Sequence, residues 1–328
     1  MQTLLLTGVA GFIGSRLAEL ILESNEPELK DIVVIGLDKL GYSGRVENLV
    51  NVEQSERFRF IKGDITDPEL IRNTFDNFNI DSTINVAAES HVDNSIKDPL
   101  LFVESNVLGT STLLEAHKQR SSGRFLQVST DEVYGSIDSG KWDETFPLKP
   151  RSPYSATKAS ADLLVQAFHT TYGVDTVITR CCNNFGPRQF PEKVIPLFVT
   201  NLIRQHKLPL YGDGSNRREW IFVDDHCFGI IDTFLKGKTG HIHHITSETE
   251  YSNKELAQEI CSIMDKDFDD VIEYVDDRKG HDFRYALDDS WTRGILGSRV
   301  HTEFRSGLQL TIQWYLENSD WWKPLVRL

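Results

Sequence analysis

Two adjacent carboxylic acids, Asp131 and Glu132, lie in the stretch STDEVYG directly after the apolar run of residues 125–128. Adjacent acids repel each other and lose hydration on burial, so their position at the end of a buried strand needs an explanation. An exposed acidic turn is one interpretation, because charged residues are mostly exposed. The other is an acid and a base side by side, since two close carboxyls cannot both ionise freely and one can stay protonated.

A phenol and an ammonium share one helix face further along the chain. Tyr154 and Lys158 are four residues apart in SPYSATKASADLL, which is the spacing of neighbours on a helix. An ammonium near a phenol favours the phenolate, so Tyr154 is a candidate base toward a sugar hydroxyl. A lone Tyr-x-x-x-Lys spacing is mostly surface coincidence, but here it follows a glycine-rich turn and the Ser-Thr pair of STDEVYG.

That glycine-rich turn predicts a dinucleotide site at the start of the chain. Gly8, Gly11 and Gly14 lie where a first strand would pass into a first helix, and glycines there let the backbone approach a pyrophosphate. Asp38 ends the next strand, 24 residues after Gly14, where its carboxylate can accept hydrogen bonds from a ribose. The carboxylate would repel a 2′-phosphate, so NAD is favoured over NADP, although the adjacent Lys39 leaves some room for NADP.

The elements that must position these residues alternate along the first half of the chain. Strands are expected at residues 3–7, 32–38, 58–61, 82–87, 124–129 and 175–180, and helices near residues 12–24, 68–78, 99–119 and 153–172. This alternation is typical of a doubly wound, mostly parallel Rossmann sheet of the α/β class. Asp64 and Ile65 follow the third expected strand, where they could border an adenine or simply form a loop.

The alternation of strands and helices ends after residue 180. It is followed by the loop-rich stretches CCNNFGPRQFPEK and LPLYGDGSNRREW, which carry most of the local basic charge. We expect these stretches to face the substrate. A later strand and helix in WIFVDDHCFGIIDTFLKG could return to the sheet. The expected division is therefore an NAD-binding Rossmann domain of residues 1–179 and 219–236, interlocked with a smaller α/β substrate domain of residues 180–218 and 237–328.

Composition narrows the partners and the compartment. The 328 residues contain 35 Lys and Arg against 49 Asp and Glu, a net charge of −14, which argues against broad attraction to nucleic acid or to an anionic membrane. The four cysteines show no metal-ligand spacing and fit a reducing cytoplasm. No basic-flanked leader and no run of 18 apolar residues occurs in the sequence, so neither a signal peptide nor a membrane span is expected.

The motifs together resemble a known family, the extended short-chain dehydrogenase/reductases. Within it the chain is most similar to the nucleotide-sugar 4,6-dehydratases, in particular those that act on dTDP-glucose. The resemblance covers essentially the whole chain and is carried by TGVAGFIGS, LDKLGYSG, AAESHVDNSI, STDEVYG, SPYSATKAS, NNFGPRQFPEKVIP, REWIFVDDH, DDRKGHDFRYALD and GLQLTIQWYLEN. Several of these motifs belong to the dehydratase branch, because the wider superfamily shares only the glycine loop and the Tyr-x-x-x-Lys spacing.

The resemblance implies a role for each of the chemical residues. Tyr154, assisted by Lys158 and with Thr130 near O4, takes the O4 proton of a hexose while C4 passes a hydride to NAD. The new ketone makes the C5 proton acidic, and Glu132 removes it. Asp131 protonates the departing C6 hydroxyl, and the hydride returns to C6. The product is a 4-keto-6-deoxy sugar, and NAD is regenerated and stays bound.

The resemblance also implies which residues bind the cofactor and the nucleotide-diphosphate hexose. The implied cofactor residues are Gly8, Gly11, Phe12, Ile13, Gly14, Asp38, Lys39, Asp64, Ile65, Ala87, Ala88, Ser90, Asn106, Tyr154, Lys158 and Asn184. The implied substrate residues are His91, Thr130, Asn183, Lys193, Val194, Pro209, Tyr211, Arg218, Arg278 and His281. No metal is implied. The helices near residues 99–119 and 153–172 resemble the family's paired dimer helices, so a homodimer is expected; the apolar stripe Leu163, Leu164, Ala167 and Phe168 could also pack within its own subunit.

Two departures from the family pattern concern the nucleotide. The family commonly has YNIGG where this chain has HHITS, with His244 and Thr246 in place of Asn and Gly. We expect this change to affect contacts with the base and ribose. Arg217 replaces a usual aliphatic residue beside Arg218.

Two other functions are compatible with the sequence. A 4-epimerase or decarboxylase of the same superfamily also begins with C4 oxidation but does not need the Asp131–Glu132 pair. A non-catalytic NAD-sensing protein could share the fold, yet the tyrosine, the lysine and both acids are present. The sequence leaves open a thymine or uracil base, glucose or a 2-acetamido sugar, and the downstream pathway.

Overall fold

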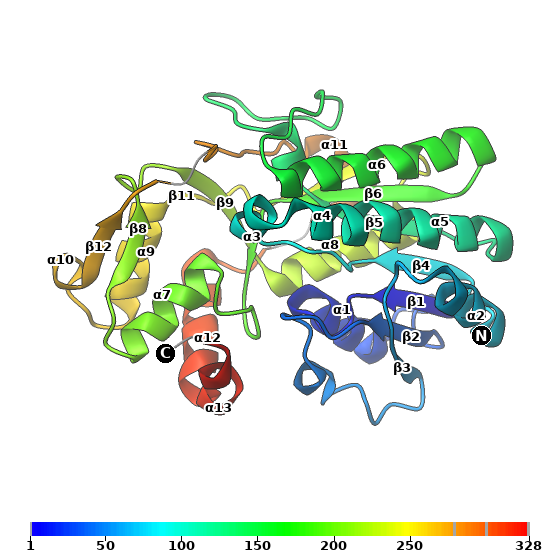
Figure 1. Ribbon diagram of the computed structural model, residues 1–328, viewed down its shortest axis with the longest axis horizontal. Helices are drawn as coiled ribbons and strands as arrows, with labels where there is room; N and C mark the ends of the chain where they lie inside the picture. The colour runs from blue at the N-terminus through cyan, green and yellow to red at the C-terminus, as the bar shows by residue number, and fades with distance from the viewer. Residues whose placement is uncertain (1, 278–279, 299–300, 327–328) are drawn as a thin grey trace.

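The computed structural model describes residues 2–277, 280–298 and 301–326 (Figure 1). Within those ranges seven strands form one sheet in the order β10-β6-β5-β4-β1-β2-β3, with every neighbouring pair parallel. The strands are β1 (Thr3–Thr7), β2 (Val33–Asp38), β3 (Phe58–Lys62), β4 (Ser82–Asn85), β5 (Phe125–Thr130), β6 (Thr176–Cys181) and β10 (Ile242–Ile245). The predicted doubly wound α/β fold is confirmed.

Helices cover both faces of this sheet, which explains the nearly continuous apolar strands. They are α1 (Phe12–Glu23), α2 (Pro68–Phe78), α5 (Gly109–Arg120), α6 (Pro153–Tyr172) and α8 (Val223–Lys236). One face packs Leu17 of α1 and Ile230 of α8 into a buried cluster. The opposite face buries Phe75 of α2, Leu113 of α5 and Val165 of α6 in a second cluster. Only the ends of the strands therefore remain open to ligands.

A smaller unit lies at the carboxyl end of the large sheet, on the left in Figure 1. In the described ranges it has a three-stranded sheet, β11-β9-β7, and a two-stranded sheet, β12-β8. Its strands are β7 (Asn183–Phe185), β8 (Leu208–Tyr211), β9 (Arg217–Phe222), β11 (Glu250–Ser252) and β12 (Ile272–Val275). Its helices are α7 (Val194–Ile203), α9 (Asn253–Ile263), α10 (Phe268–Val271), α12 (Phe304–Glu317) and α13 (Ser319–Trp322). Helix α11 (Ser290–Leu296) instead packs against α8 and β10 of the large sheet. A third cluster, including Phe185, Phe198 and Trp220, forms its core.

Two strands differ from the expected assignment. The strand in WIFV, β9, does not return to the large sheet but pairs with β7 and β11, because Trp220 and Phe222 pack with Phe185 in the smaller core. Strand β10 instead joins the large sheet beside β6, and its Ile245 packs in the cluster of α8. The two-domain division itself stays a prediction.

The segment expected as one helix near residues 99–119 is composite. Short helices α3 (Val92–Lys97) and α4 (Pro99–Phe102) lead into a π-helical segment, Val103–Leu108, and then into α5. Pro99 starts α4 and the Asp98 side chain caps it, accepting from the Leu101 amide, which explains the interruption. No helix in the described part of the chain is both long enough and apolar enough to cross a membrane.

Candidate active site

A cavity of about 300 Å³ opens at the carboxyl ends of the central strands. Its walls come from the β1–α1 turn, the ends of β2, β4 and β5, the start of α6 and the segment after β6. Strand β1 has β2 on one side and β4 on the other, so the chain reverses its direction of winding here. Ligands bind at such a switch point in open α/β sheets.

The glycine-rich turn is shaped to receive a diphosphate. Gly8 has a φ of +68°, and a Cβ there would lie 2.7 Å from the Ala87 nitrogen. A Cβ on Gly14 would lie 2.1 Å from the Gly8 carbonyl oxygen, so the helix can approach the turn only with glycine. Gly11 is the N-cap of α1 and offers no side-chain cap. The first amides of α1 are therefore free of a capping side chain and can bind an anion.

Asp38 occupies the ribose end of this cavity. Its carboxylate accepts from the amides of Ala10 at 3.0 Å and Leu40 at 2.8 Å. Burial raises the pKa of Asp38, and these two hydrogen bonds oppose the rise. Lys39 forms ion pairs with two carboxylates: its Nζ lies 3.0 Å from Glu89 and 3.9 Å from Asp64. With its charge compensated in this way, Lys39 is poorly placed to hold a 2′-phosphate, which favours NAD.

Most of the predicted cofactor residues line the same cavity. These are Gly8, Gly11, Phe12, Ile13, Gly14, Asp38, Lys39, Asp64, Ile65, Ala87, Ala88, Ser90, Tyr154, Lys158 and Asn184. The buried Oδ1 of Asn184 has no hydrogen-bond partner among the described residues, so it can accept from an amide of a bound ligand. Asn106 is different: it is buried behind the wall, where it bonds the Glu89 backbone and the Thr157 hydroxyl. These features fit NAD.

Both acids of STDEVYG border the cavity, on the one-turn 3₁₀ helix η3 (Asp131–Tyr134) that follows β5. Asp131 is 2% exposed. Thr130 donates to its Oδ1 at 3.1 Å, while its Oδ2 has no partner within the described chain. Burial, followed by repulsion from Glu132 and Glu219, raises the pKa of Asp131 well above its ordinary value. Asp131 is therefore suited to carry a proton, as an acid beside Glu132 must.

Helix α6 brings Tyr154 and Lys158 to the same cavity. The helix starts at a capping box in which the Ser152 and Ser155 side chains each bond the other's backbone amide, with Pro153 in the first turn. Lys158 donates to the Val128 carbonyl at 2.6 Å, and burial lowers its pKa. Burial also raises the pKa of Tyr154 well above its ordinary value, and the charges of Glu132, Cys181 and Asp131 raise it further. These effects favour the protonated phenol, so the predicted phenolate requires added positive charge near its ring.

The predicted substrate residues divide into two groups. Asn183, Lys193 and Thr130 line the cavity. Beside it, a second cavity of about 310 Å³ also touches Glu132, Asp282 and Tyr285. Arg218, 5% exposed, lies against that wall: its guanidinium is 4.1 Å from the centre of the Tyr285 ring and donates to the Asp282 carbonyl at 2.9 Å.

The remaining substrate residues border neither cavity in the described part of the chain. His91 caps α3 and its Nε2 lies 3.9 Å from Glu192, which does line the larger cavity. Val194 starts α7 next to Lys193, while Pro209 and Tyr211 lie on β8. The Tyr211 ring is edge-on to His281 at 6.2 Å. Arg278 lies outside the described residues, and the roles of the whole set stay predictions.

One contact across the cavity was not foreseen from the sequence. The Tyr42 hydroxyl donates to Glu192 Oε1 at 2.7 Å, and the Tyr42 ring is edge-on to Phe190 at 5.4 Å. Tyr42 follows β2 on the cofactor side, whereas Glu192 precedes α7 on the substrate side. Both lie in recognised stretches, LDKLGYSG and FGPRQFPEK, but their pairing spans 150 residues and leaves no local signal.

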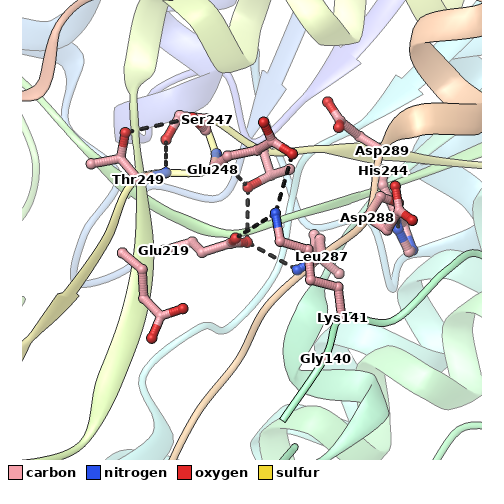
Figure 2. Close-up of polar contacts among 12 residues, drawn as sticks. Gly140, Lys141, Glu219, His244, Ser247, Glu248, Thr249, Leu287, Asp288 and Asp289 are labelled. Carbon is pink, nitrogen blue, oxygen red and sulfur yellow. Dashed lines mark hydrogen bonds and ion pairs between the residues drawn. The ribbon is translucent and has the colours of Figure 1, made fainter.

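The two substituted side chains of HHITS are buried in the protein interior. His244 and Thr246 are each 1% exposed and, among the described residues, neither borders a cavity. The Thr246 hydroxyl and the Leu287 amide each donate to Glu219 Oε2 at 2.9 Å, and Lys141 lies between Glu219 and Glu248 (Figure 2).

Arg217 likewise does not add free charge beside Arg218. It forms ion pairs with Glu250 and Glu255. These substituted residues therefore make structural contacts within the protein, and their effect on nucleotide binding stays a prediction.

Comparison with known proteins agrees with this geometry. Residues 5–311 match the family model described as GDP-mannose 4,6 dehydratase. A dTDP-glucose 4,6-dehydratase of Streptomyces niveus is 46% identical, over 98% of this chain and 95% of its own. The DesIV dTDP-glucose 4,6-dehydratase of Streptomyces venezuelae, solved with NAD and a second ligand bound, is 48% identical with a TM-score of 0.96, over 99% of this chain and 100% of its own. A Thermotoga maritima UDP-glucose 4-epimerase is 26% identical with a TM-score of 0.88, over 97% of this chain and 100% of its own.

The pKa of Asp131 generates a stability prediction. Because burial holds this pKa above its unfolded value, the unfolded state loses the proton first as the pH rises from about 4. Stability present below about pH 4 is then lost as the pH approaches the folded pKa. Asp131→Asn has no carboxyl to ionise and escapes this loss, so the difference between its unfolding midpoint and that of the parent should grow in its favour as the pH rises above about 4.

The exposed Asp138→Asn is the matched control for removing one carboxyl, and its difference from the parent should not widen. An Asp131→Asn advantage that stays constant or shrinks as the pH rises would contradict the burial argument.

Proposed function

Because the chain belongs to the GDP-mannose 4,6 dehydratase family, we propose that it is an NAD-dependent dTDP-glucose 4,6-dehydratase. Relatives of that activity are 46–48% identical over nearly the whole chain. The observation that carries the proposal is the common cavity of Asp131, Glu132, Tyr154 and Lys158. The first two supply an acid and a base for elimination, and the last two supply the groups for oxidation at C4.

The order of steps follows from the acidity of the sugar. A C5 proton is not acidic until C4 is a ketone, so oxidation must come first. Tyr154 takes the O4 proton, with Lys158 behind it and the Thr130 hydroxyl close to O4. NAD, when bound, supplies the acceptor for the C4 hydrogen, its later return, and the positive charge that the buried phenol needs.

Elimination then uses the two adjacent acids in opposite protonation states. Glu132 removes the C5 proton, and the electron pair forms the C5–C6 double bond as the C6 hydroxyl leaves. Asp131 gives its proton to that hydroxyl, so water departs; its raised pKa keeps the proton available. The C4 hydrogen finally reaches C6 and a proton returns to C5. The net change is the loss of one water, with the cofactor regenerated.

Local basic and amide groups support binding of the diphosphate despite the acidic chain. Asn183 and Lys193 line the cavity, and Arg218 lies beside the adjoining one. Lys193 donates to the Ser90 carbonyl at 2.8 Å, which links the two sides of the site. We assign these three residues to the diphosphate, with the sugar between them and Glu132.

A 4-epimerase is the second candidate, favoured by the likeness to the Thermotoga maritima enzyme. Epimerisation needs Tyr154 and the cofactor but neither elimination acid. The burial of Asp131 with a raised pKa is unnecessary for that reaction, so the dehydratase accounts for more of the site.

An exposed apolar face supports a homodimer. Leu100 is 70% exposed, Leu108 51% and Leu163 55%, on α4, the π-helical segment and α6. These three elements pack against one another. Figure 1 shows α5, which continues the π-helical segment, beside α6 on one face of the sheet. Of the predicted stripe, Leu163 and Ala167 are exposed, while Leu164 and Phe168 partly pack against the subunit's own core. Apolar patches of this kind mark interfaces, and a second copy would cover this one.

We also assign the protein to the cytoplasm. All four cysteines are buried free thiols, a state that fits a reducing compartment.

Two substitutions separate the oxidation from the elimination. Glu132→Gln keeps size and hydrogen bonding but cannot accept the C5 proton, so oxidation should proceed and the near-ultraviolet absorbance of reduced cofactor should build up in a single turnover. Overall turnover should fall by about 10²–10⁴. Tyr154→Phe should instead slow the appearance of that absorbance. Normal turnover by Glu132→Gln alongside an inactive Tyr154→Phe would favour the epimerase.

The dimer is tested by a charge on the apolar face. Leu163→Asp should halve the mass measured by light scattering, because a buried unpaired carboxylate opposes association. Leu310→Asp is the matched control, since Leu310 on α12 is 57% exposed against 55% for Leu163. An unchanged mass for Leu163→Asp, or a parent protein that is monomeric at micromolar concentration, would overturn the assignment.

A further inference from the structure

A buried chain of hydrogen bonds connects the turn that carries the two acids with the helix that carries Lys158. Arg180 on β6 donates from Nε to Asp162 Oδ2 at 2.9 Å and from Nη1 to the Tyr134 hydroxyl at 2.6 Å. That hydroxyl lies 2.7 Å from His244 Nε2. Asp162, Arg180, Tyr134 and His244 are each 2% exposed or less, so water does not compete for these bonds.

Each bond in this chain runs in one direction only. A guanidinium donates hydrogen bonds and never accepts them. The Tyr134 hydroxyl therefore accepts a hydrogen bond from Arg180 and donates one to His244. His244 Nδ1 lies 2.8 Å from the Asp288 carbonyl oxygen, which only accepts; Figure 2 shows the two residues side by side. The proton of the ring is therefore on Nδ1, and Nε2 is the acceptor. Burial lowers the pKa of His244 to about 3, which keeps the ring neutral.

This series of hydrogen bonds links two elements that carry catalytic groups. Tyr134 is the last residue of η3, which begins with Asp131 and Glu132. Its ring is held by Trp142, stacked at 5.2 Å, and by the edge-on His244 at 5.5 Å. At the other end Asp162 lies one helical turn after Lys158, and its charge opposes the lowering of the Lys158 pKa by burial.

We propose that His244 is a positioning residue for the dehydration: its Nε2 holds the Tyr134 hydroxyl and thereby fixes the turn that bears Asp131 and Glu132. The proposal rests on the proposed function for its catalytic consequence, but the contact itself does not. An Asn amide reaches about as far as Nδ1, so it can bond the Asp288 carbonyl but cannot reach Tyr134.

This geometry supplies a matched pair of variants. His244→Asn keeps a polar group at the Nδ1 position only, whereas His244→Gln carries an amide out to the Nε2 position and restores a partner for Tyr134. Both are neutral amides of similar polarity. A difference between them therefore reports the Tyr134 contact rather than the loss of an imidazole.

The experiment measures hydrogen–deuterium exchange of peptides covering residues 130–135, together with steady-state turnover of dTDP-glucose, for the full-length protein. Losing one buried hydrogen bond should make exchange in this turn about tenfold faster in His244→Asn. The kcat should fall about tenfold with KM unchanged, since the elimination acids rather than the binding residues are displaced. His244→Gln should stay within about threefold of the parent. The double variant His244→Asn/Tyr134→Phe should have the same exchange rate and kcat as Tyr134→Phe alone, because the hydrogen bond between the two residues is already lost.

Each outcome bears on the proposal. Exchange in His244→Asn equal to that of the parent, or equal losses in the Asn and Gln variants, would overturn it. If His244→Asn does not fold, Tyr134→Phe must show the faster exchange, and its absence would overturn the proposal too. A parent protein that turns over no dTDP-glucose yet shows the expected exchange pattern would refute the proposed function and leave the His244 contact standing.

Discussion

The unfavourable burial of a carboxyl at the end of β5 is the constraint around which the site is organised. Asp131 is 2% exposed and has Glu132 beside it, so ionising it inside the protein is disfavoured. Thr130 donates one hydrogen bond, and the positive charge of Arg218 opposes the rise in pKa without cancelling it. The raised pKa favours the protonated form of Asp131, which is the form of one acid that elimination of a hydroxyl requires.

The parallel sheet explains why the acids and the cofactor site coincide. Strands covered by helices on both faces can be reached only at their ends, and parallel strands all end at the same edge. Gly8 after β1, Asp38 at the end of β2 and Thr130 at the end of β5 therefore border one cavity. The smaller unit then closes the far side of that cavity with Asn183 and Lys193. Oxidation and elimination thus share one site, and the sugar need not move between them.

Local sequence patterns predicted the parts of this arrangement that local physics determines. The six expected strands match β1 to β6 within a few residues at each end, because each is a short apolar run between turns. The glycines of the first turn, Asp38 and the Tyr154–Lys158 spacing were also found, since each depends on residues close in sequence. Helix α6 runs from residue 153 to 172 as expected, set by its Ser152 capping box and by Gly173 at its end.

What the sequence did not predict depends on contacts between distant segments. Whether β9 or β10 joins the large sheet is decided by which core receives Trp220 or Ile245. The Tyr42–Glu192 hydrogen bond joins two loops, and the burial of His244 against Tyr134 joins residues 110 apart. The side chains of His244 and Thr246 bond Tyr134 and Glu219 inside the protein, and neither partner is close in sequence.

One site that oxidises C4, eliminates water and returns the same hydrogen to C6 must transfer a label from C4 to C6 of the same sugar. This is tested by supplying dTDP-glucose carrying deuterium at C4, without added cofactor, and locating the label in the product by mass spectrometry and NMR. We expect a 4-keto-6-deoxy product with the deuterium at C6 and one solvent-derived hydrogen at C5. Deuterium retained at C4 of an epimer that has lost no water, or label lost to solvent or to free cofactor, would contradict it.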